Sequence, residues 1–230
     1  MIGKRFNKSS ASDDGVENVF WITMTDLLLG LAIVFMSLFI MAMTGFTQIQ
    51  INSQATQSEV AKKLIDNMQA QKINAQIDQF TGQVKISDLE LFELNDYNLS
   101  EKGKKYLDKF IPIYVNTIFS NKELGEKITG VVIQGHTDSQ NYAGLYSKED
   151  QFTKNMELSL KRANAVAEYI FKTGYNKKYS DKLTKNLVVE GKSFTEPVII
   201  NGKEDYNKSR RVELKLIVKE SNIKDFLVKK

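Results

Sequence analysis

Residues 20–46 read FWITMTDLLLGLAIVFMSLFIMAMTGF, an apolar block that contains one ionisable side chain, Asp26. A helix needs about 20 apolar residues to cross the hydrocarbon core of a bilayer, so this block predicts a transmembrane helix. A cleaved signal peptide fits poorly, because its apolar region would be about half as long and would end in a small-x-small cleavage site. We expect everything else in the chain to be organised around this span.

The composition of the 230-residue chain excludes several classes of function. The formal net charge is only +4, and Lys and Arg are interspersed with Asp and Glu, so nucleic-acid binding is not expected. Cysteine is absent, which excludes disulfides and thiolate metal sites. The single histidine, His136, cannot form a metal site by itself, and no nucleophile–base pair indicates an enzyme. We expect no cofactor.

The charges that flank the span predict its orientation. Lys4, Arg5 and Lys8 precede it, whereas the other flank carries no charge until Glu59. Positive charge is retained in the cytoplasm, so residues 1–19 are expected to form a cytoplasmic tail and residues from 47 onward to lie outside the cytoplasm.

Polar and small residues of the span recur at intervals of 3, 4, 7 and 7: Thr23, Asp26, Gly30, Ser37 and Thr44. This spacing predicts a face that packs against other helices, although Thr, Ser and Gly are also simply common in membrane helices. A carboxylate that faces lipid costs about 2.5–3.5 kcal/mol on insertion scales, so Asp26 is expected to face a bundle interior or a water path. Asp26 therefore predicts a partner subunit.

Residues 47–80 contain neither proline nor glycine, and two apolar stripes with a phase break between them predict a helical linker over residues 47–82. The first stripe comprises Val60, Leu64 and Met68. Three interpretations stay open for this segment: a coiled-coil stalk, a plug lying on the membrane, or a solvated spacer.

From Gln83 the pattern predicts a compact α+β domain over residues 83–220, with a mixed sheet and helices on one face, followed by a tail at 221–230. Helices are expected at 99–118, capped by Ser100 and interrupted or kinked at Pro112, and at 156–173, with Leu160 inward and Gly174 as its stop. Strands are expected at 84–91, with a turn at Ser87 and Asp88, and at 129–134, 187–190 and 211–218, and residues 139–154 are expected to form a polar loop.

Four separated motifs carry a family resemblance: LFELNDYNLSEKG (91–103), GHTD (135–138), NMELSLKRANAV (155–166) and SRRVEL (209–214). In this order they resemble the OmpA-like peptidoglycan-binding domain over residues 83–220. The resemblance implies that Asp138 and Arg162 grip the diaminopimelate of the peptide stem.

The chemistry of the ligand agrees with this assignment. A free amino-acid end carries one ammonium and one carboxylate, so one Asp and one Arg can pair both. Thr137, Asn155 and Ser159 are expected to add hydrogen bonds or to shape the loop, while Leu158 is expected to pack the helix. His136 is expected to be structural, and Arg210 and Arg211 either pair with carboxylates near the site or are surface charges.

Two features depart from the family pattern. Sixteen residues separate Asp138 from Asn155, a longer segment than usual, and Ser209 replaces the Asn expected before the two arginines. The longer segment offers Tyr142 and Tyr146 for stacking on a sugar or a peptide.

The whole chain looks like the MotB group of ion-driven stator subunits, with WITMTDL (21–27) opening the span, and within that group like the motor component of Zorya anti-phage defence systems. The resemblance implies that Asp26 binds and releases a proton, or sodium, beside a multi-span MotA-like partner, in a dimer of the bacterial inner membrane whose domain binds peptidoglycan in the periplasm. The alternatives are a flagellar-type stator protein and a passive OmpA-like tether between membrane and wall.

Overall fold

The computed structural model describes residues 13–73, 75–93, 96–144 and 147–219. Two compact units divide the chain: Met1–Ile49 with Asn222–Lys230, and Gln50–Ser221. The expected tail at 221–230 and most of the expected cytoplasmic tail lie outside the described residues. The first helix, α1 (Asp13–Ala70), is 58 residues long and belongs to both units.

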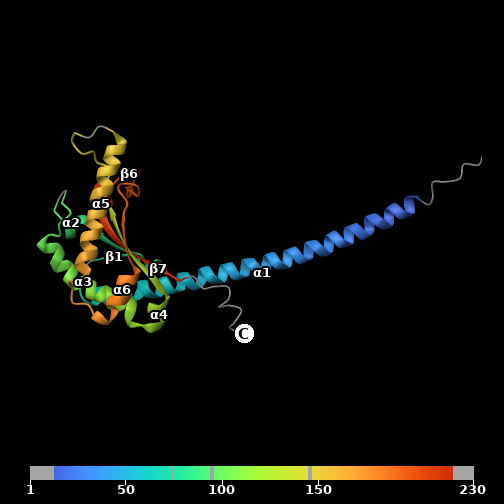
Figure 1. Ribbon diagram of the computed structural model, residues 1–230, viewed down its shortest axis with the longest axis horizontal. Helices are drawn as coiled ribbons and strands as arrows, with labels where there is room; N and C mark the ends of the chain where they lie inside the picture. The colour runs from blue at the N-terminus through green and yellow to red at the C-terminus, as the bar shows by residue number, and fades with distance from the viewer. Residues whose placement is uncertain (1–12, 74, 94–95, 145–146, 220–230) are drawn as a thin grey trace, which may run out of the picture. The chain divides into compact units, whose positions relative to one another are not determined.

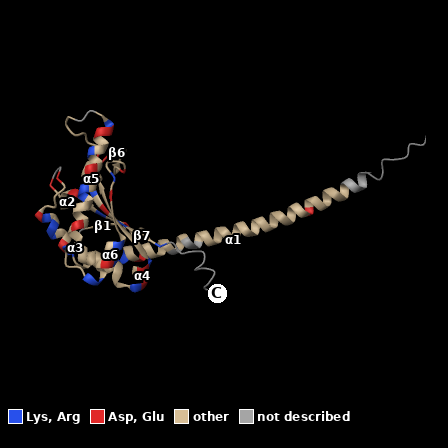
Figure 2. Cartoon of the chain, viewed as in Figure 1, with Lys and Arg blue, Asp and Glu red and all other residues tan. Residues whose placement is uncertain are grey.

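In the first unit, α1 contains the predicted membrane span. Residues Asn18–Thr47 have a mean hydropathy of 2.5, and none of their side chains is buried. Figure 2 shows this part of α1 free of charge except for one acidic residue, which the sequence identifies as Asp26. The hydroxyls of Ser37 and Thr44 donate to carbonyls four residues earlier, at 2.8 and 3.0 Å. The helix therefore satisfies these polar groups internally, as a bilayer requires.

The second unit begins within α1, whose last turns pack into its core. Val60, Leu64 and Met68 are at most 2% exposed, and Asn67 Nδ2 donates to Thr117 Oγ1 at 2.8 Å. The expected helical linker over 47–82 is correct only as far as Ala70, because the chain then turns into strand β1 (Gln76–Ile77). The first apolar stripe is therefore part of a folded core, and a solvated spacer is the wrong description of residues 60–68.

A five-stranded mixed sheet, in the order β1-β2-β7-β3-β4, forms the centre of this unit. Its strands after β1 are β2 (Val84–Ser87), β3 (Ile128–His136), β4 (Leu187–Gly191) and β7 (Arg211–Val218). Only β3 and β4 pair in parallel. The predicted α+β class is confirmed, and β3 extends past both ends of the predicted strand. A separate ribbon pairs β5 (Ile199–Ile200) with β6 (Lys203–Glu204).

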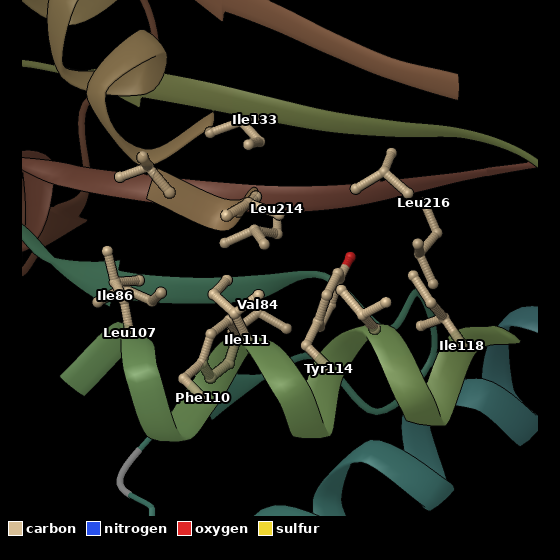
Figure 3. Packing of buried hydrophobic residues seen from close by; sticks show 14 of the residues in the cluster. Val84, Ile86, Leu107, Phe110, Ile111, Tyr114, Ile118, Ile133, Leu214 and Leu216 are labelled. Atoms are coloured by element: carbon tan, nitrogen blue, oxygen red, sulfur yellow. The ribbon is translucent and has the colours of Figure 1, made fainter. Parts of the chain in front are cut away.

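Helix α3 (Glu101–Ser120) covers one face of the sheet, and Figure 3 shows its apolar side chains meeting those of β2, β3 and β7. Phe110 and Tyr114 of α3 and Leu214 of β7 are at most 1% exposed. Ser100 caps α3 as predicted, its Oγ accepting from the Gly103 amide at 3.0 Å. The helix continues through Pro112, so an interruption there was wrongly expected; the packed face offsets the one lost backbone hydrogen bond.

Helix α5 (Lys148–Ile170) differs most from the sequence-based expectation (Figure 1). It begins eight residues before the expected start, so the polar loop is shorter than 139–154. Ser147 caps it, with Oγ accepting from the Asp150 amide at 2.9 Å, a start signal followed by acidic first-turn residues. It ends at Ile170, ahead of Gly174, and Leu160 is 45% exposed, so its inward placement was wrong.

The remaining helices are short: α2 (Asp88–Leu91), α4 (Lys122–Lys127), a 3-10 turn (Lys177–Tyr179), α6 (Ser180–Asn186) and α7 (Tyr206–Ser209). Two of them matter for the site. Helix α2 replaces the second half of the strand pattern expected at 84–91, and α7 immediately precedes β7. Both place residues at the end of the sheet where β3 finishes.

Candidate functional site

The site lies where β3 ends against α5, and two glycines allow this close approach. A Cβ on Gly135 would lie 1.9 Å from the Ser159 carbonyl oxygen, and one on Gly191 would lie 2.9 Å from Ser159 Oγ. Gly135 and Gly191 are partners in the β3–β4 ladder. Any side chain at either position would push α5 away from the sheet, because such short distances are sterically forbidden.

A cavity of about 300 Å³ opens beside this contact. It brings together four of the five residues predicted to bind peptidoglycan, and its lining comprises Thr137, Asp138, Gln140, Asn141, Tyr142, Ala143, Asn155, Leu158, Arg162 and Arg210. The fifth, Ser159, does not line it. Leu158, which was expected to pack the helix, also lines the cavity.

Ser159 has a packing role instead. It is fully buried, its Oγ donates to the Met156 carbonyl at 2.9 Å, and the same oxygen accepts from the Ser193 amide at 3.1 Å. A small side chain is required there because Gly135 and Gly191 lie against it. The motif match pointed to a ligand contact, but the close helix–strand packing accounts for the residue.

Arg162 is held rigidly at the cavity wall. It is 2% exposed, its Nε donates to the Asp96 carbonyl at 2.9 Å, and its Nη1 lies 3.1 Å from Asp88 Oδ2. The guanidinium stacks over Phe92 at 5.3 Å from the ring centroid. Among the described residues Nη2 has no hydrogen-bond acceptor, so this nitrogen is the donor left for a ligand.

Two further charged residues complete what we call the cavity cluster: Asp88, Asp138, Arg162 and Arg210. Arg210 donates through Nη1 to Asp138 Oδ2, and its Nε lies 3.6 Å from Asp88 Oδ2. Asp88 is 2% exposed, and this burial raises the pKa of its carboxyl while Arg162 and Arg210 oppose the rise. The cluster therefore contains two carboxylates and two guanidinium groups.

Sequence reasoning missed Asp88 and left Arg210 undecided. Asp88 was expected in a turn, and only strand pairing reveals its neighbour: its amide donates to the Arg210 carbonyl at 3.1 Å, next to the Ser87–Arg211 pair of β2 and β7. The available signal was an acidic residue directly after a strand, which is common at helix starts and therefore uninformative by itself.

Two uncharged groups at the cavity are notable. Thr137 is 3% exposed, and its Oγ1 has no hydrogen-bond partner among the described residues. Tyr142 is held by Gln151, which accepts from the Tyr142 amide at 2.8 Å and donates to its carbonyl at 3.1 Å. The longer segment after Asp138 is thus fastened to the first turns of α5. Tyr146 lies outside the described residues.

A second buried group, which we call the sheet cluster, comprises Gln83, His136, Arg211 and Glu213. Arg211 Nε donates to Glu213 Oε1 at 2.6 Å, Gln83 donates to Oε2, and His136 Nε2 lies 3.6 Å from Oε2. Burial alone would raise the pKa of Glu213, but His136 and Arg211 hold it at about 2. Arg211 therefore has a structural role, and it belongs to the same cluster as His136, for which a structural role was expected.

Two residues of the sheet cluster, together with Glu196, are close enough to be considered as ligands of a metal ion. Ligand atoms of His136, Glu196 and Glu213 lie within 4.8 Å of one another. Both oxygens of Glu213 are already engaged by Arg211 and Gln83, however, and a guanidinium beside a cation is unfavourable. Because the carboxylate of Glu213 is already occupied, the three residues do not fit a metal site.

Ser209, which departs from the family motif, is also structural. It is fully buried, and its Oγ accepts from the Val198 amide at 3.0 Å. The hydroxyl thereby fastens the segment that precedes the β5–β6 ribbon to the start of β7. The substitution leaves the cavity lining unchanged, because Ser209 is absent from it.

Comparison with known proteins places the chain in a family. The OmpA family model matches residues 91–211, more than half of the chain. The Zorya protein ZorB of Escherichia coli (Crooks strain) is 31% identical over 228 residues, covering 94% of this chain and 93% of that protein. The ZorB of a second Escherichia coli strain is 25% identical, covering 94% and 87%.

Solved structures that this chain is similar to include a MotB-like protein from Desulfovibrio vulgaris, at 19% identity and a TM-score of 0.48, covering 76% of this chain and 96% of that one. The periplasmic domain of Helicobacter pylori MotB matches at 17% identity and a TM-score of 0.46, covering 67% and 94%. From the family model and the full-length relatives, the chain belongs to the OmpA family and is a homologue of the Zorya protein ZorB.

Proposed function

We propose that this chain is the wall-anchored subunit of an ion-driven, MotA/MotB-like motor in the bacterial inner membrane, acting in Zorya anti-phage defence. The observation that carries the proposal is the cavity where Asp138 and Arg162 meet, in a chain that also has a membrane span with one carboxylate. The similarity to ZorB over 94% of the chain supports the defence role over that of a flagellar-type stator.

The cavity suits the free amino-acid end of diaminopimelate in the wall peptide. Asp138 offers a carboxylate to the ligand's ammonium, and Nη2 of Arg162 offers a donor to its carboxylate. The unpaired hydroxyl of Thr137 and the amide of Asn155 add neutral hydrogen bonds at the same wall. A ligand with both charges gives an acceptor to Arg162 Nη2 and a partner to the unpaired Thr137 hydroxyl, and its ammonium adds a second cation beside Asp138, which already pairs with Arg210.

Asp26 would carry the ion. The side chain is exposed on the span and forms no ion pair within the described part of the chain, so a partner must cover it in the membrane. A carboxylate in that setting can bind and release a proton or a sodium ion. Moving one charge across 100 mV of potential releases about 2.3 kcal/mol, which can drive motion when another part is held by the wall.

The partners follow from this mechanism. We expect the chain to form a dimer and to bind a multi-span MotA-like subunit, ZorA-like in this system. The face of the span formed by Thr23, Gly30, Ser37 and Thr44 would pack against the helices of that subunit. The positive tail would lie in the cytoplasm and residues 50–219 in the periplasm. No enzymatic step is involved, because such a motor converts an ion gradient into movement.

Wall binding can be tested by sedimentation of the full-length protein in detergent with purified peptidoglycan sacculi. The wild-type protein should co-sediment, and free meso-diaminopimelate should compete. Arg162→Ala should reduce binding at least tenfold, because one charged contact is lost. Lys161→Ala is the matched control. It removes a positive charge at the next position, where the Lys161 ammonium pairs with Glu157 on the exposed face of α5. Equal binding by Arg162→Ala and Lys161→Ala would refute the wall-binding site.

The motor can be tested by Asp26→Asn in cells challenged with phage. The substitution removes the titratable group but keeps its shape, so resistance and proton flux should both be lost while wall binding persists. Thr25→Ser is a control at the adjacent position. If Asp26→Asn retains resistance while Arg162→Ala loses it, the chain is a passive tether. Restored swimming in a strain without its own stator would instead indicate a flagellar-type role.

A further inference from the structure

Asp88 is the member of the cavity cluster that does not line the cavity. Both carboxylate oxygens are buried, and Oδ2 lies 3.1 Å from Arg162 Nη1 and 3.6 Å from Arg210 Nε. No backbone amide of the described residues donates to either oxygen, so the two guanidinium groups are the partners of this carboxylate. A buried ion pair of this kind is weak evidence for a role in stability, so its presence beside the cavity calls for another explanation.

The charges around the cavity supply that explanation. The charged side chains of its lining are Asp138, Arg162 and Arg210, which leave an excess of one positive charge. Asp88 lies behind the two arginines and cancels this excess. Its position is fixed by the backbone, because its amide donates to the Arg210 carbonyl at 3.1 Å. The cavity cluster is therefore neutral as a whole while still presenting both signs of charge.

We infer that Asp88 sets the specificity of the cavity, making it select a zwitterionic amino-acid end over a plain carboxylate. This inference rests on the proposed wall binding and concerns which chemical group is accepted. A neutral cluster gains nothing from a ligand with surplus negative charge, whereas a cluster with one surplus guanidinium would attract any carboxylate. The ammonium of the zwitterion pairs with Asp138 while its carboxylate pairs with Arg162. A plain carboxylate can make only the second of these contacts.

The experiment compares two ligands of equal length: meso-diaminopimelate, whose ends are zwitterionic, and pimelate, which has the two carboxylates but no amines. Isothermal titration of the full-length protein in detergent gives the ratio of their dissociation constants. Wild-type protein should favour meso-diaminopimelate. Asp88→Asn, which keeps the side-chain shape, should lower this preference by about tenfold or more, chiefly through tighter pimelate binding, as expected for one unit charge at this range.

Glu90→Gln is the matched control. It removes the same charge two residues away on α2, where Glu90 is half exposed and pairs with Lys102. The ligand preference should stay at the wild-type value, because solvent screens an exposed charge.

A second variant keeps the inference testable if Asp88→Asn does not fold. Arg210→Gln makes the cluster more negative and should raise the preference for meso-diaminopimelate over pimelate by weakening pimelate. An unchanged ratio in the folded variants, or an equal loss for both ligands, would overturn the role of Asp88. Failure of the wild-type protein to bind meso-diaminopimelate would instead refute the proposed wall binding.

Discussion

Arg210 and Arg211 are adjacent in the sequence, yet they serve two clusters of opposite character. Arg211 lies in the sheet cluster, where Glu213 receives hydrogen bonds on both oxygens. Arg210 lies in the cavity cluster, where Asp88 has only the guanidinium groups of Arg162 and Arg210 as partners and Arg162 keeps one nitrogen without an acceptor among the described residues. Successive side chains of a strand point to opposite faces, so the two arginine side chains diverge at the start of β7. A cluster whose carboxylate is paired on both oxygens stabilises the fold, whereas one whose cavity wall keeps a free donor is available to a ligand.

The largest expected effect comes from Arg211→Ala. This change leaves the buried carboxylate of Glu213 without its main partner, so the free energy of unfolding should fall by about 3–5 kcal/mol. Thermal unfolding of the full-length protein in detergent, followed by near-ultraviolet circular dichroism, measures the loss. The folded fraction should bind sacculi normally.

Arg210→Ala provides the contrast, because Asp88 keeps Arg162 and Asp138 borders the open cavity. Its cost in stability should be clearly smaller. An equal cost for the two arginine variants would remove the distinction between the clusters.

The second prediction concerns how the free energy of unfolding changes in acid, which should differ between the sheet cluster and the cavity cluster. Glu213 has a pKa of about 2 against its usual 4.5, because His136 and Arg211 outweigh the effect of burial. Its stabilisation is complete above pH 4.5 and is lost as the pH falls toward 2, amounting to about 3.5 kcal/mol at about 1.4 kcal/mol per pKa unit. Chemical denaturation at several pH values should show this loss in the wild-type protein, and Glu213→Gln should lack it.

Asp88 should behave with the opposite sign. Burial raises the pKa of its carboxyl, so the folded state binds that proton more readily than the unfolded chain does. The contribution of Asp88 is therefore most favourable at low pH and declines as the pH rises. The Asp88→Asn variant should therefore still lose stability in acid as the wild-type protein does. If it does not, the acid-induced loss arises in the cavity cluster and not at Glu213.

Asp138→Asn should affect binding more than stability. The carboxylate borders the cavity, and an amide of the same shape preserves the contact with the Gln140 amide at 3.1 Å but gives up the ion pair with Arg210. Loss of one charged partner costs about 2 kcal/mol or more, so sacculus binding should weaken at least about 30-fold. The midpoint of thermal unfolding, measured in parallel, should fall by less than it does in Arg211→Ala.

The smallest effect is expected at the loop clamp. Gln151→Ala removes both hydrogen bonds to the Tyr142 backbone, so about 1 kcal/mol of local stability should be lost. Hydrogen exchange at the Tyr142 amide should accelerate, and sacculus binding should weaken only a few-fold. Gln140→Ala, on the same segment but outside the clamp, is the control for exchange.

The resemblance to the OmpA-like domain, and not the pattern of strands and helices, linked Asp138 with Arg162 before the fold was known. The structure places one just after β3 and the other on α5, and both line the same cavity. Asp88 could not be connected to them, because its contact with Arg210 depends on the pairing of β2 with β7 across most of the domain. Tertiary register of this kind is not encoded in local pattern.

Two misplacements have local causes. The start of α5 was placed too late because its first turns are polar, although Ser147 and the acids after it form an ordinary helix start. The stripe of Val60 and Leu64 was recognised, but periodicity reveals only that a helix has an apolar face and not what covers it.

The burial of that stripe bears on how the chain can be divided. A fragment that begins at Gly82 would leave an open apolar trough where Val60, Leu64 and Met68 normally lie, and would be prone to aggregate. The smallest piece expected to remain soluble and folded begins before Thr56, so a protease that cuts the folded protein should release a fragment retaining the last turns of α1.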